Sequence, residues 1–206
     1  VDEIQNIPNL LPLIHSLIEQ YHDLLFILTG SSARKLRRAG SDLLAGRALY
    51  CEMHPFMASE LGSRFNLEDA LLHGTLPIVY TSSEKQHILN SYCQLYLKEE
   101  VQMEALVRNI GDFSRFMETL SFTHGSTINI SNIARECEVN RKTAEGYVII
   151  IEDLLLGFHV NVFTRRAKRQ LAGHPKFYYF DTGVFRTLRP DGPIDSRTEA
   201  EGVALE

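Results

Sequence analysis

The N-terminal residues 1–30 combine a helical pattern with a short apolar run. Apolar side chains recur at helical spacing from Leu10 to Tyr21, after the potential N-cap Asn9, and predict an amphipathic helix. Residues 24–30 then form a continuous apolar run, typical of a strand buried on both faces of a parallel sheet. With strands also expected at residues 1–4 and 48–53, this order predicts an α/β sheet.

A helical region follows from residue 61. One short helix is expected at residues 67–72, where Gly74 and Pro77 end it, and the longest helical stretch covers residues 88–110. The helical period continues over residues 113–120, up to a linker at residues 123–126.

Residues 128–156 have the pattern of two short helices joined by a tight turn. Ser131 or Asn132 would cap the first helix, Asn140 would cap the second, and Gly157 would end it. Two strand-like segments follow, at residues 158–163 and 176–180, with the basic run 165–169 between them. A helix-turn-helix followed by a hairpin is the layout of a winged helix, so we expect one here.

Composition narrows the class of protein. Of the 206 residues, 44% are hydrophobic and 23% are charged, as in ordinary globular domains. The net charge of -5 argues against a protein that coats nucleic acid through charge alone. The three cysteines form no C-x-x-C, which favours reduced thiols and a cytoplasmic protein, and no apolar run approaches the ~20 residues of a membrane-spanning helix.

Both ends of the chain have the pattern of interrupted elements. The first residue is Val1 rather than methionine, and it stands directly before Asp2 and Glu3. Residues 199–206 have a helical pattern whose apolar positions have barely begun. We therefore expect the chain to be a fragment of a longer protein.

An acidic pair at the end of a predicted parallel strand is the first candidate for chemistry. Asp2 and Glu3 occupy that place, and Thr29, Ser31 and Ser32 end the next strand. Because ligands bind at the carboxyl ends of parallel strands, these side chains would share one crevice. One acid could hold Mg²⁺ through water and the other could orient the attacking water of phosphoryl transfer. A solvated strand end beside an ordinary cap is the alternative.

An ordered set of motifs resembles prokaryotic AAA+-type ATPases that carry a C-terminal domain of unknown function, domain of unknown function 4143. The motifs cover nearly the whole chain and lie at residues 1–5, 28–34, 43–47, 74–77, 96–100 and 176–183. The resemblance implies that Asp2 and Glu3 are the Walker B acids, with Asp2 holding Mg²⁺ through water. It also implies that Thr29 and Ser31 stand where the sensor residue lies, and that Arg47 senses or compensates phosphate charge.

The phosphate cradle of such ATPases is missing. A P-loop needs G-x-x-x-x-G-K-[ST], and residues 30–35 are a near miss that lacks the second glycine and the hydroxyl residue. We expect the cradle to lie upstream of Val1. ATP and Mg²⁺ are therefore expected cofactors of the longer parent protein, whereas this chain should bind neither tightly and should be inactive alone.

The predicted winged helix has two open interpretations. Arg141, Lys142 and Thr143 at the start of the second helix, with Arg165 and Arg166 in the wing, could contact DNA. Against this, residues 131–169 hold seven Lys/Arg and five Asp/Glu, a surplus of two that is small for a DNA-binding module. A protein partner or a structural role is the other interpretation, with Ile149 and Ile150 available to meet a neighbouring domain.

We thus expect an α/β protein with a helical part, in four regions, and oligomers are possible. Residues 1–58 would be the C-terminal half of an AAA+ core, 59–122 a helical lid, and 123–165 the winged helix. By the same resemblance, residues 166–206 would begin a restriction-endonuclease-like α/β domain whose first acidic residue is Glu206; an exposed helix residue is the alternative. The eight histidines form no H-E-x-x-H pair and are expected to be surface or partly buried polar residues, not metal ligands.

Overall fold

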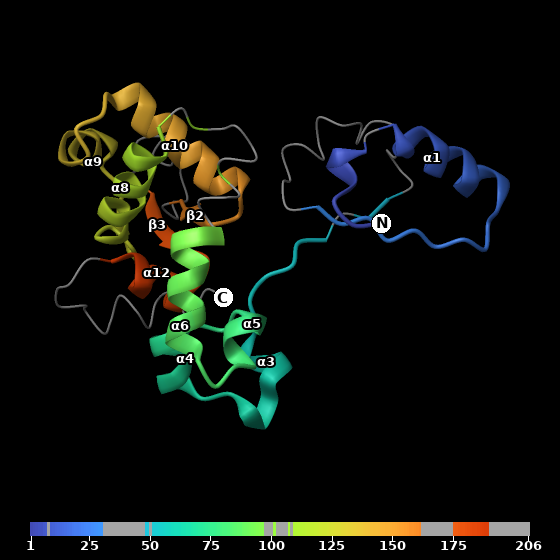
Figure 1. The fold of residues 1–206 in the computed structure, drawn as a ribbon, viewed down its shortest axis with the longest axis horizontal. Helices are drawn as coiled ribbons and strands as arrows, with labels where there is room; N and C mark the ends of the chain where they lie inside the picture. Colours follow the sequence, from blue (N-terminus) through green and yellow to red (C-terminus); the bar gives the residue numbers. More distant parts are fainter. Residues whose placement is uncertain are drawn as a thin grey trace, which may run out of the picture. The chain divides into compact units, whose positions relative to one another are not determined.

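The structure is a computed structural model that describes residues 1–7, 9–30, 48–49, 51–96, 101, 107, 109–161 and 175–189. The chain divides into two compact units, Val1–Glu52 and Met53–Glu206, each of which is described by itself (Figure 1). Of the sequence predictions, Ser31, Ser32, Arg47, the basic run 165–169, the helix at 199–206 and Glu206 lie outside the described residues.

One helix packs on an extended segment in the first unit. The predicted helix is confirmed as α1 (Leu10–Gln20), although the side chain of Asn9 makes no capping hydrogen bond. Leu11 and Ile14 of α1 are buried together with Ile4, which begins the short 3-10 helix η1 (Ile4–Asn6). Phe26 and Leu28 pack against this small core from the side of the extended segment.

The extended segment at residues 24–30 starts a parallel pair with the N-terminus. The amine of Val1 donates to the carbonyl of Ile27 at 2.7 Å, and the carbonyl of Val1 accepts from Thr29 N–H at 2.9 Å. These two bonds bracket Leu28, which is the hydrogen-bond pattern of parallel neighbours. The pairing does not continue into a regular ladder among the described residues.

The prediction that this segment is buried on both faces is wrong. Leu25 is 87% exposed and Ile27 is 70% exposed, whereas Phe26 and Leu28 face the core. The apolar run therefore alternates between two faces, of which α1 covers one. Where they are described, residues 48–53 form no strand, and Leu49 is 95% exposed.

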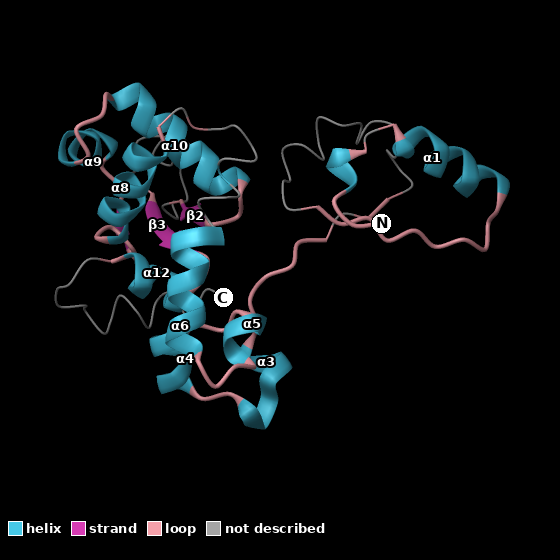
Figure 2. Cartoon of the chain, in the orientation of Figure 1, coloured by secondary structure: helices cyan, strands magenta, loops and turns pink. Residues whose placement is uncertain are grey.

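The second unit begins with short helices (Figure 2). They are α3 (Ala58–Leu61), η3 (Gly62–Arg64), α4 (Leu67–His73), α5 (Pro77–Tyr80), α6 (Lys85–Ser91) and the π-helix η4 (Tyr92–Tyr96). The predicted helix at 67–72 is confirmed as α4, capped by the Asn66 side chain and followed by Gly74. The prediction of one helix over 88–110 is wrong at its end. Asn109 has extended backbone, and its side chain caps the next helix by accepting from Gly111 N–H at 3.0 Å.

Four helices and a small antiparallel sheet follow among the described residues of this unit. Their chain order is α8 (Ile110–Ser121), β1 (Ser126–Thr127), α9 (Ile130–Glu136), α10 (Arg141–Asp153), β2 (Gly157–Val160), β3 (Lys176–Tyr179) and α12 (Thr182–Leu188). The strands lie in the order β1, β3, β2, with Phe177 of the central strand opposite Ser126 and His159. The sequence predicts a domain boundary between residues 165 and 166, and the pairing of β2 with β3 joins residues on both sides of it.

The helix ends at α9 and α10 differ in part from the predicted ones. Asn140 caps α10 as predicted, because its side chain accepts from Thr143 N–H at 2.8 Å. For α9 the cap is Asn129, ahead of the predicted Ser131 or Asn132. Helix α10 ends at Asp153 and not at Gly157, since Leu155 adopts a left-handed φ of 57° that turns the chain into β2.

The core of the second unit lies between the helices and the sheet. Tyr147 of α10 packs edge-on against Phe113 and Phe116 of α8, at ring-centroid distances of 5.2 and 5.3 Å. On α10, Ala144, Val148 and Ile151 are buried at helical spacing and form the stripe that faces the core. Ile150 is also buried, contrary to prediction, whereas Ile149 is 56% exposed.

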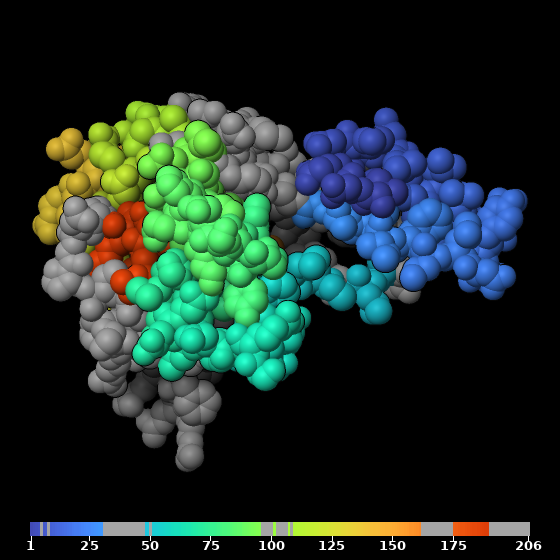
Figure 3. All heavy atoms as spheres, turned by 60° about the horizontal axis from the view of Figure 1, so that its bottom comes forward, coloured from blue at the N-terminus to red at the C-terminus, as the bar shows by residue number. Residues whose placement is uncertain are grey.

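Helix α12 closes this core from another side. Its residues contact α4, α6, α8 and η4. Figure 3 shows the α12 residues, in red, between the yellow-green residues of α8 and the green residues of α4 to α6. Val184 and Phe185 of α12 are fully buried. The start of the predicted nuclease-like region, up to Arg189, therefore shares the core of the helices that precede it.

Candidate functional site

The first candidate site is the contact between Asp2 and Thr29. The Thr29 hydroxyl donates a hydrogen bond to a carboxylate oxygen of Asp2. Backbone bonds hold the two residues side by side, because Thr29 N–H donates to Val1 at 2.9 Å and Thr29 accepts from Ile4 N–H at 3.0 Å. Both side chains are exposed at the same edge of the paired segments.

Glu3 stands at a sharp turn directly after this contact. Its backbone is left-handed, with φ of 50° and ψ of 46°, a conformation that costs a residue with a Cβ roughly 1 kcal/mol. The turn leads into η1, where Ile4 is fully buried and anchors the chain. Glu3 is exposed, and the chain turns away from the paired segments at this residue.

The donor set at this edge suits a hard cation. A carboxylate beside a hydroxyl presents oxygen atoms of the kind that Mg²⁺ prefers, with water filling the remaining positions. The described residues contain no group of three or more His, Cys, Asp and Glu side chains arranged to hold a metal ion. The chemistry available from Asp2, Glu3 and Thr29 is therefore that of a water-mediated Mg²⁺ contact and not of an all-protein metal cage.

Two motifs that carry the family resemblance meet in the second unit. The buried carboxylate of Asp181 accepts hydrogen bonds from Thr75 N–H at 2.8 Å and from Val184 N–H at 2.9 Å. The hydroxyl of Thr182 donates to the carbonyl of Ala70 at 2.6 Å. Residues 181–183 thereby hold the end of α4 and the 74–77 loop against the start of α12. We call this contact the α4–α12 junction.

Glycine is required on both sides of the α4–α12 junction. Gly74 has φ of +73°, and a Cβ there would lie 2.1 Å from a carboxylate oxygen of Asp181. A Cβ on Gly183 would lie 2.1 Å from the carbonyl oxygen of His73. Any side chain is excluded at these two positions, because a Cβ atom would overlap the Asp181 carboxylate or the His73 carbonyl.

Asp181 is a structural and not a reactive carboxylate. Burial raises its pKa, and the backbone N–H groups that it accepts act in the opposite direction. With Asp181 and Thr182 both fully buried, no substrate reaches the carboxylate from solvent. In the sequence, Asp181 and Thr182 contributed only to the family resemblance. The polar Asp181 before an apolar stretch was the signal of a helix N-cap that could have shown its role.

The candidate DNA-contacting residues lie at the start of α10. Arg141 pairs with Glu145 of the same helix at 2.9 Å, Lys142 is exposed, and the N–H of Thr143 is used in capping. From Ile130 to Asp153 the formal charge is -2, because three basic residues face five acidic ones: Arg135, Arg141 and Lys142 against Glu136, Glu138, Glu145, Glu152 and Asp153. Arg165 and Arg166 lie outside the described residues.

One histidine departs from the expectation of surface positions. His124 is 1% exposed, and its Nδ1 accepts from Tyr179 N–H at 3.1 Å. Its ring stacks on Phe185 with centroids 4.1 Å apart. Placed in a predicted linker between helices, His124 gave no periodic signal by which a core residue could be recognised.

Comparison with known proteins places the second unit in a family. The profile of a domain of unknown function, DUF8612, matches residues 64–195, which is more than half of the chain. The chain belongs to the DUF8612 family. The profile of an AAA domain matches residues 1–62, the part that holds the Asp2–Thr29 contact. The finer assignment to domain of unknown function 4143 stays a prediction.

Two curated relatives are similar to this DUF8612 chain over most of its length. They are the uncharacterised protein Mb2031c of Mycobacterium bovis and the uncharacterised protein Rv2008c of Mycobacterium tuberculosis. Each is 25% identical over 193 residues, which cover 91% of this DUF8612 chain and 43% of the relative. The chain thus spans less than half the length of these relatives. No solved structure matches it.

A membrane-spanning helix is not found in the part of this DUF8612 chain that the structure describes, since none of its helices combines sufficient length with sufficient apolar character.

Proposed function

We propose that residues 1–62 supply one half of the ATP site of a protein that binds and hydrolyses ATP. The observation that carries the proposal is the hydrogen bond from Thr29 to Asp2, which joins the ends of two neighbouring parallel segments. Nucleotide sites in α/β proteins lie at that edge. The match of an AAA domain to the same residues supports this interpretation.

Each residue has a distinct part in this proposal. Asp2 would hold Mg²⁺ through water, and Thr29 would keep the Asp2 carboxylate oriented. Glu3, exposed at the turn, would orient or deprotonate the attacking water. Bound ATP would supply the phosphoryl group, and its Mg²⁺ ion would neutralise the negative charge of the phosphates. Ser31 is proposed beside Thr29, and Arg47 as a group that compensates phosphate charge.

The test uses a longer protein that contains both this chain and a P-loop. Glu3→Gln should retain ATP and slow its hydrolysis by ~10²–10⁴, the usual contribution of a positioned base. Glu19→Gln is the matched control, because Glu19 is an exposed carboxylate of α1 in the same unit. An unchanged hydrolysis rate in Glu3→Gln would remove Glu3 from the proposal.

Arg47 is tested by separating stability from turnover. Arg47→Ala should lower the ATPase rate by about tenfold or more, since a guanidinium near the γ-phosphate stabilises developing charge. The thermal midpoint should stay within a few degrees, because in this proposal Arg47 serves the nucleotide and contributes at most ~1 kcal/mol to folding. A variant whose activity falls only in proportion to its stability would assign Arg47 a structural role.

We also propose that α8 to β3 form a winged helix that recognises a protein partner. The strand order β1, β3, β2 around α9 and α10 is the arrangement that such a fold requires. The formal charge of -2 from Ile130 to Asp153, with Arg141 already paired to Glu145, favours a protein over DNA. The exposed Ile149 offers an apolar contact in the middle of α10.

A further inference from the structure

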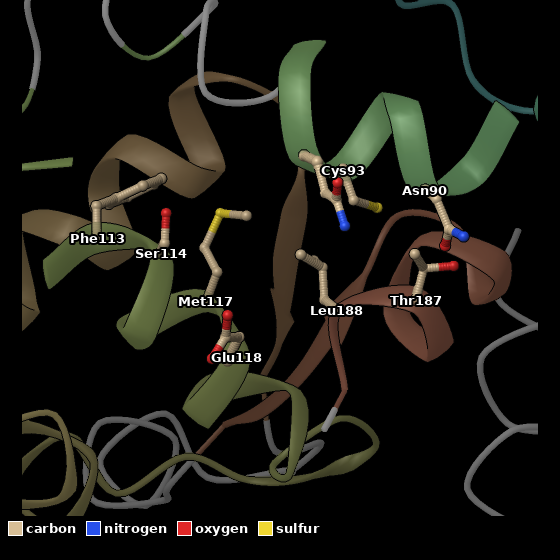
Figure 4. A pocket seen from close by; sticks show the side chains of 9 residues that line it. Asn90, Cys93, Phe113, Ser114, Met117, Glu118, Thr187 and Leu188 are labelled. Atoms are coloured by element: carbon tan, nitrogen blue, oxygen red, sulfur yellow. The ribbon is translucent and has the colours of Figure 1, made fainter. Parts of the chain in front are cut away.

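A small pocket lies within the second unit where η4, α8 and α12 meet (Figure 4). Its volume is about 140 Å³. Sites for nucleotides and drug-sized ligands occupy roughly 300–1,000 Å³, so this pocket is too small for either. A single group of side-chain size is the largest occupant that it can enclose.

The floor of the pocket is apolar. Cys93, Phe113 and Met117 line it and are 6%, 2% and 4% exposed. In Figure 4 the side chains of Cys93 and Met117 converge on Leu188 of α12 from two different helices. Such a floor favours a short hydrocarbon stem, because enclosing apolar surface contributes about 0.8 kcal/mol for each buried CH₂ group.

The rim of the pocket is polar and carries one sign of charge. Ser114 and Thr187 provide hydroxyl groups, and Glu118 provides a carboxylate. The described lining contains no Lys, Arg or His. Behind the floor, the Asp181 carboxylate is near enough to act with burial in raising the pKa of the Cys93 thiol to about 12. Glu118 is therefore the one charged side chain in the described lining of the pocket.

The wall of the pocket is built by an unusual element. Cys93 and Gln94 belong to η4, a five-residue π-helix that directly follows α6. π-helical segments are rare, and they occur frequently at functional sites because the wider turn redirects side chains. Here η4, the π-helical segment that follows α6, borders the pocket.

We propose that this pocket binds one cationic group, a primary ammonium or a guanidinium, carried on a short apolar stem. The stem would lie on Cys93, Met117 and Leu188, and the cation would meet Glu118 with Ser114 and Thr187 as hydrogen-bond acceptors. The occupant is either a free small amine or a lysine or arginine side chain of a partner protein. This proposal is independent of the ATP site.

The binding is reversible and not covalent. A thiol with a pKa of about 12 is protonated at neutral pH and is a poor nucleophile. Cys93 therefore contacts the occupant as part of the apolar wall and does not react with it. Amide signals of residues near the pocket are the suitable readout.

The first experiment titrates the 206-residue chain with n-butylammonium chloride while amide chemical shifts are followed by NMR. Saturable shifts should be confined to residues around 114, 118 and 187, with a Kd in the millimolar range expected of about five non-hydrogen atoms. n-Butanol, which has the same stem without the charge, should bind about fivefold more weakly. Equal binding of the two compounds, or no saturable shift, would overturn the proposal.

Two variants and a control locate the interaction. Glu118→Gln should weaken n-butylammonium binding by about fivefold, because the exposed carboxylate contributes up to ~1 kcal/mol. Ser114→Leu should abolish it by filling the pocket. Glu136→Gln removes an exposed carboxylate of α9 outside the lining and should leave binding unchanged. If Glu136→Gln weakens binding as much as Glu118→Gln, the cation is attracted by net charge alone and the pocket assignment fails.

The source of the cation is decided by a comparison of two probes. A blocked tripeptide, acetyl-Gly-Lys-Gly-amide, presents the same ammonium group on a peptide backbone. Binding at least as tight as that of n-butylammonium supports a lysine side chain of a partner. Exclusion of the tripeptide with retention of n-butylammonium supports a free amine.

Discussion

His124 shows how much one buried polar side chain determines at the residue scale. It lies in the aromatic core of the second unit, accepts a backbone hydrogen bond from Tyr179, and stacks on Phe185. Burial, and secondarily the charge of Arg189, lowers its pKa to about 4. Because the unfolded chain has the ordinary histidine pKa near 6.5, the folded state binds fewer protons between these values. Folding stability from this residue is therefore present above pH 6.5 and is lost as the pH falls toward 4.

The predicted size of this effect is about 3 kcal/mol, from the difference between the two pKa values. His124→Phe should be less stable than the parent chain at pH 7, since Tyr179 loses its acceptor, but should lose less stability on acidification. Urea unfolding between pH 7 and pH 4.5 measures both. His87→Phe is the control, because His87 is exposed. A difference in unfolding free energy between parent and His124→Phe that stays constant over this range would refute the prediction.

Two glycines of the same unit should respond in opposite directions to the same substitution. Gly183→Ala places a Cβ against the carbonyl of His73 at the α4–α12 junction, and such overpacking against backbone costs about 3 kcal/mol. Gly146→Ala adds a Cβ with no atom within 4 Å in the interior of α10, and should stabilise by ~0.5–1 kcal/mol.

Thermal unfolding of both glycine variants checks this pair. The thermal midpoint should fall for Gly183→Ala and rise slightly for Gly146→Ala. If Gly183→Ala were as stable as the parent chain, the close approach of residues 73 and 183 would be wrong.

At the element scale, helices with a strong periodic pattern were predictable and the first-unit strands were not. The helices α1, α4 and α10 show apolar stripes and, for α4 and α10, a side-chain cap that the sequence contains locally. The run at residues 24–30 is apolar at every position from Leu24 to Leu28, which cannot distinguish burial on one face from burial on two. Whether its second face is buried depends on which other element packs against it, and the sequence of the run does not contain that information.

The charge of α9 and α10 predicts weak binding to DNA. Neutralising phosphates needs clustered Lys and Arg side chains, and the segment from Ile130 to Asp153 carries a formal charge of -2. At about 150 mM salt the 206-residue chain should therefore show no saturable binding of duplex DNA at micromolar concentration in fluorescence anisotropy. Glu145→Gln, which frees Arg141 from its partner, should increase any binding at low salt. Tight, salt-dependent binding that Arg141→Ala abolishes would restore the DNA interpretation.

At the scale of the whole molecule, the two units differ in how far their sites could be predicted. Asp2 and Thr29 meet because the ends of adjacent parallel segments share one edge, a rule that the sequence order is enough to apply. The contact of Asp181 with Thr75 joins residues 106 positions apart, and neither residue is part of a periodic pattern that indicates it. Contacts fixed by a general rule of topology were predictable, whereas contacts fixed by this particular packing were not.

The absence of a P-loop sequence predicts how the chain responds to nucleotide. Without the backbone N–H groups and the lysine that hold the phosphates, Asp2 and Thr29 provide only contacts through water. Calorimetric titration of the 206-residue chain with Mg-ATP should show no saturable heat at micromolar protein, and no phosphate should be released. A 1:1 isotherm with a micromolar Kd would show that other residues of the chain hold the phosphates.

The α4–α12 junction also constrains the order in which the protein acquires its structure during synthesis. Helix α4 and the 74–77 loop are held by Asp181 and Thr182, which lie 106 and 112 residues from their respective partners. At ~5–20 residues per second, the ribosome adds these partners several seconds after α4 has been made. Closing a loop of this length costs about 4 kcal/mol in chain entropy before the contacts form. Helix α4 therefore cannot make its contacts with α12 until α12 has been translated, which happens after the sheet. We expect α4 to be among the last helices to reach its native position.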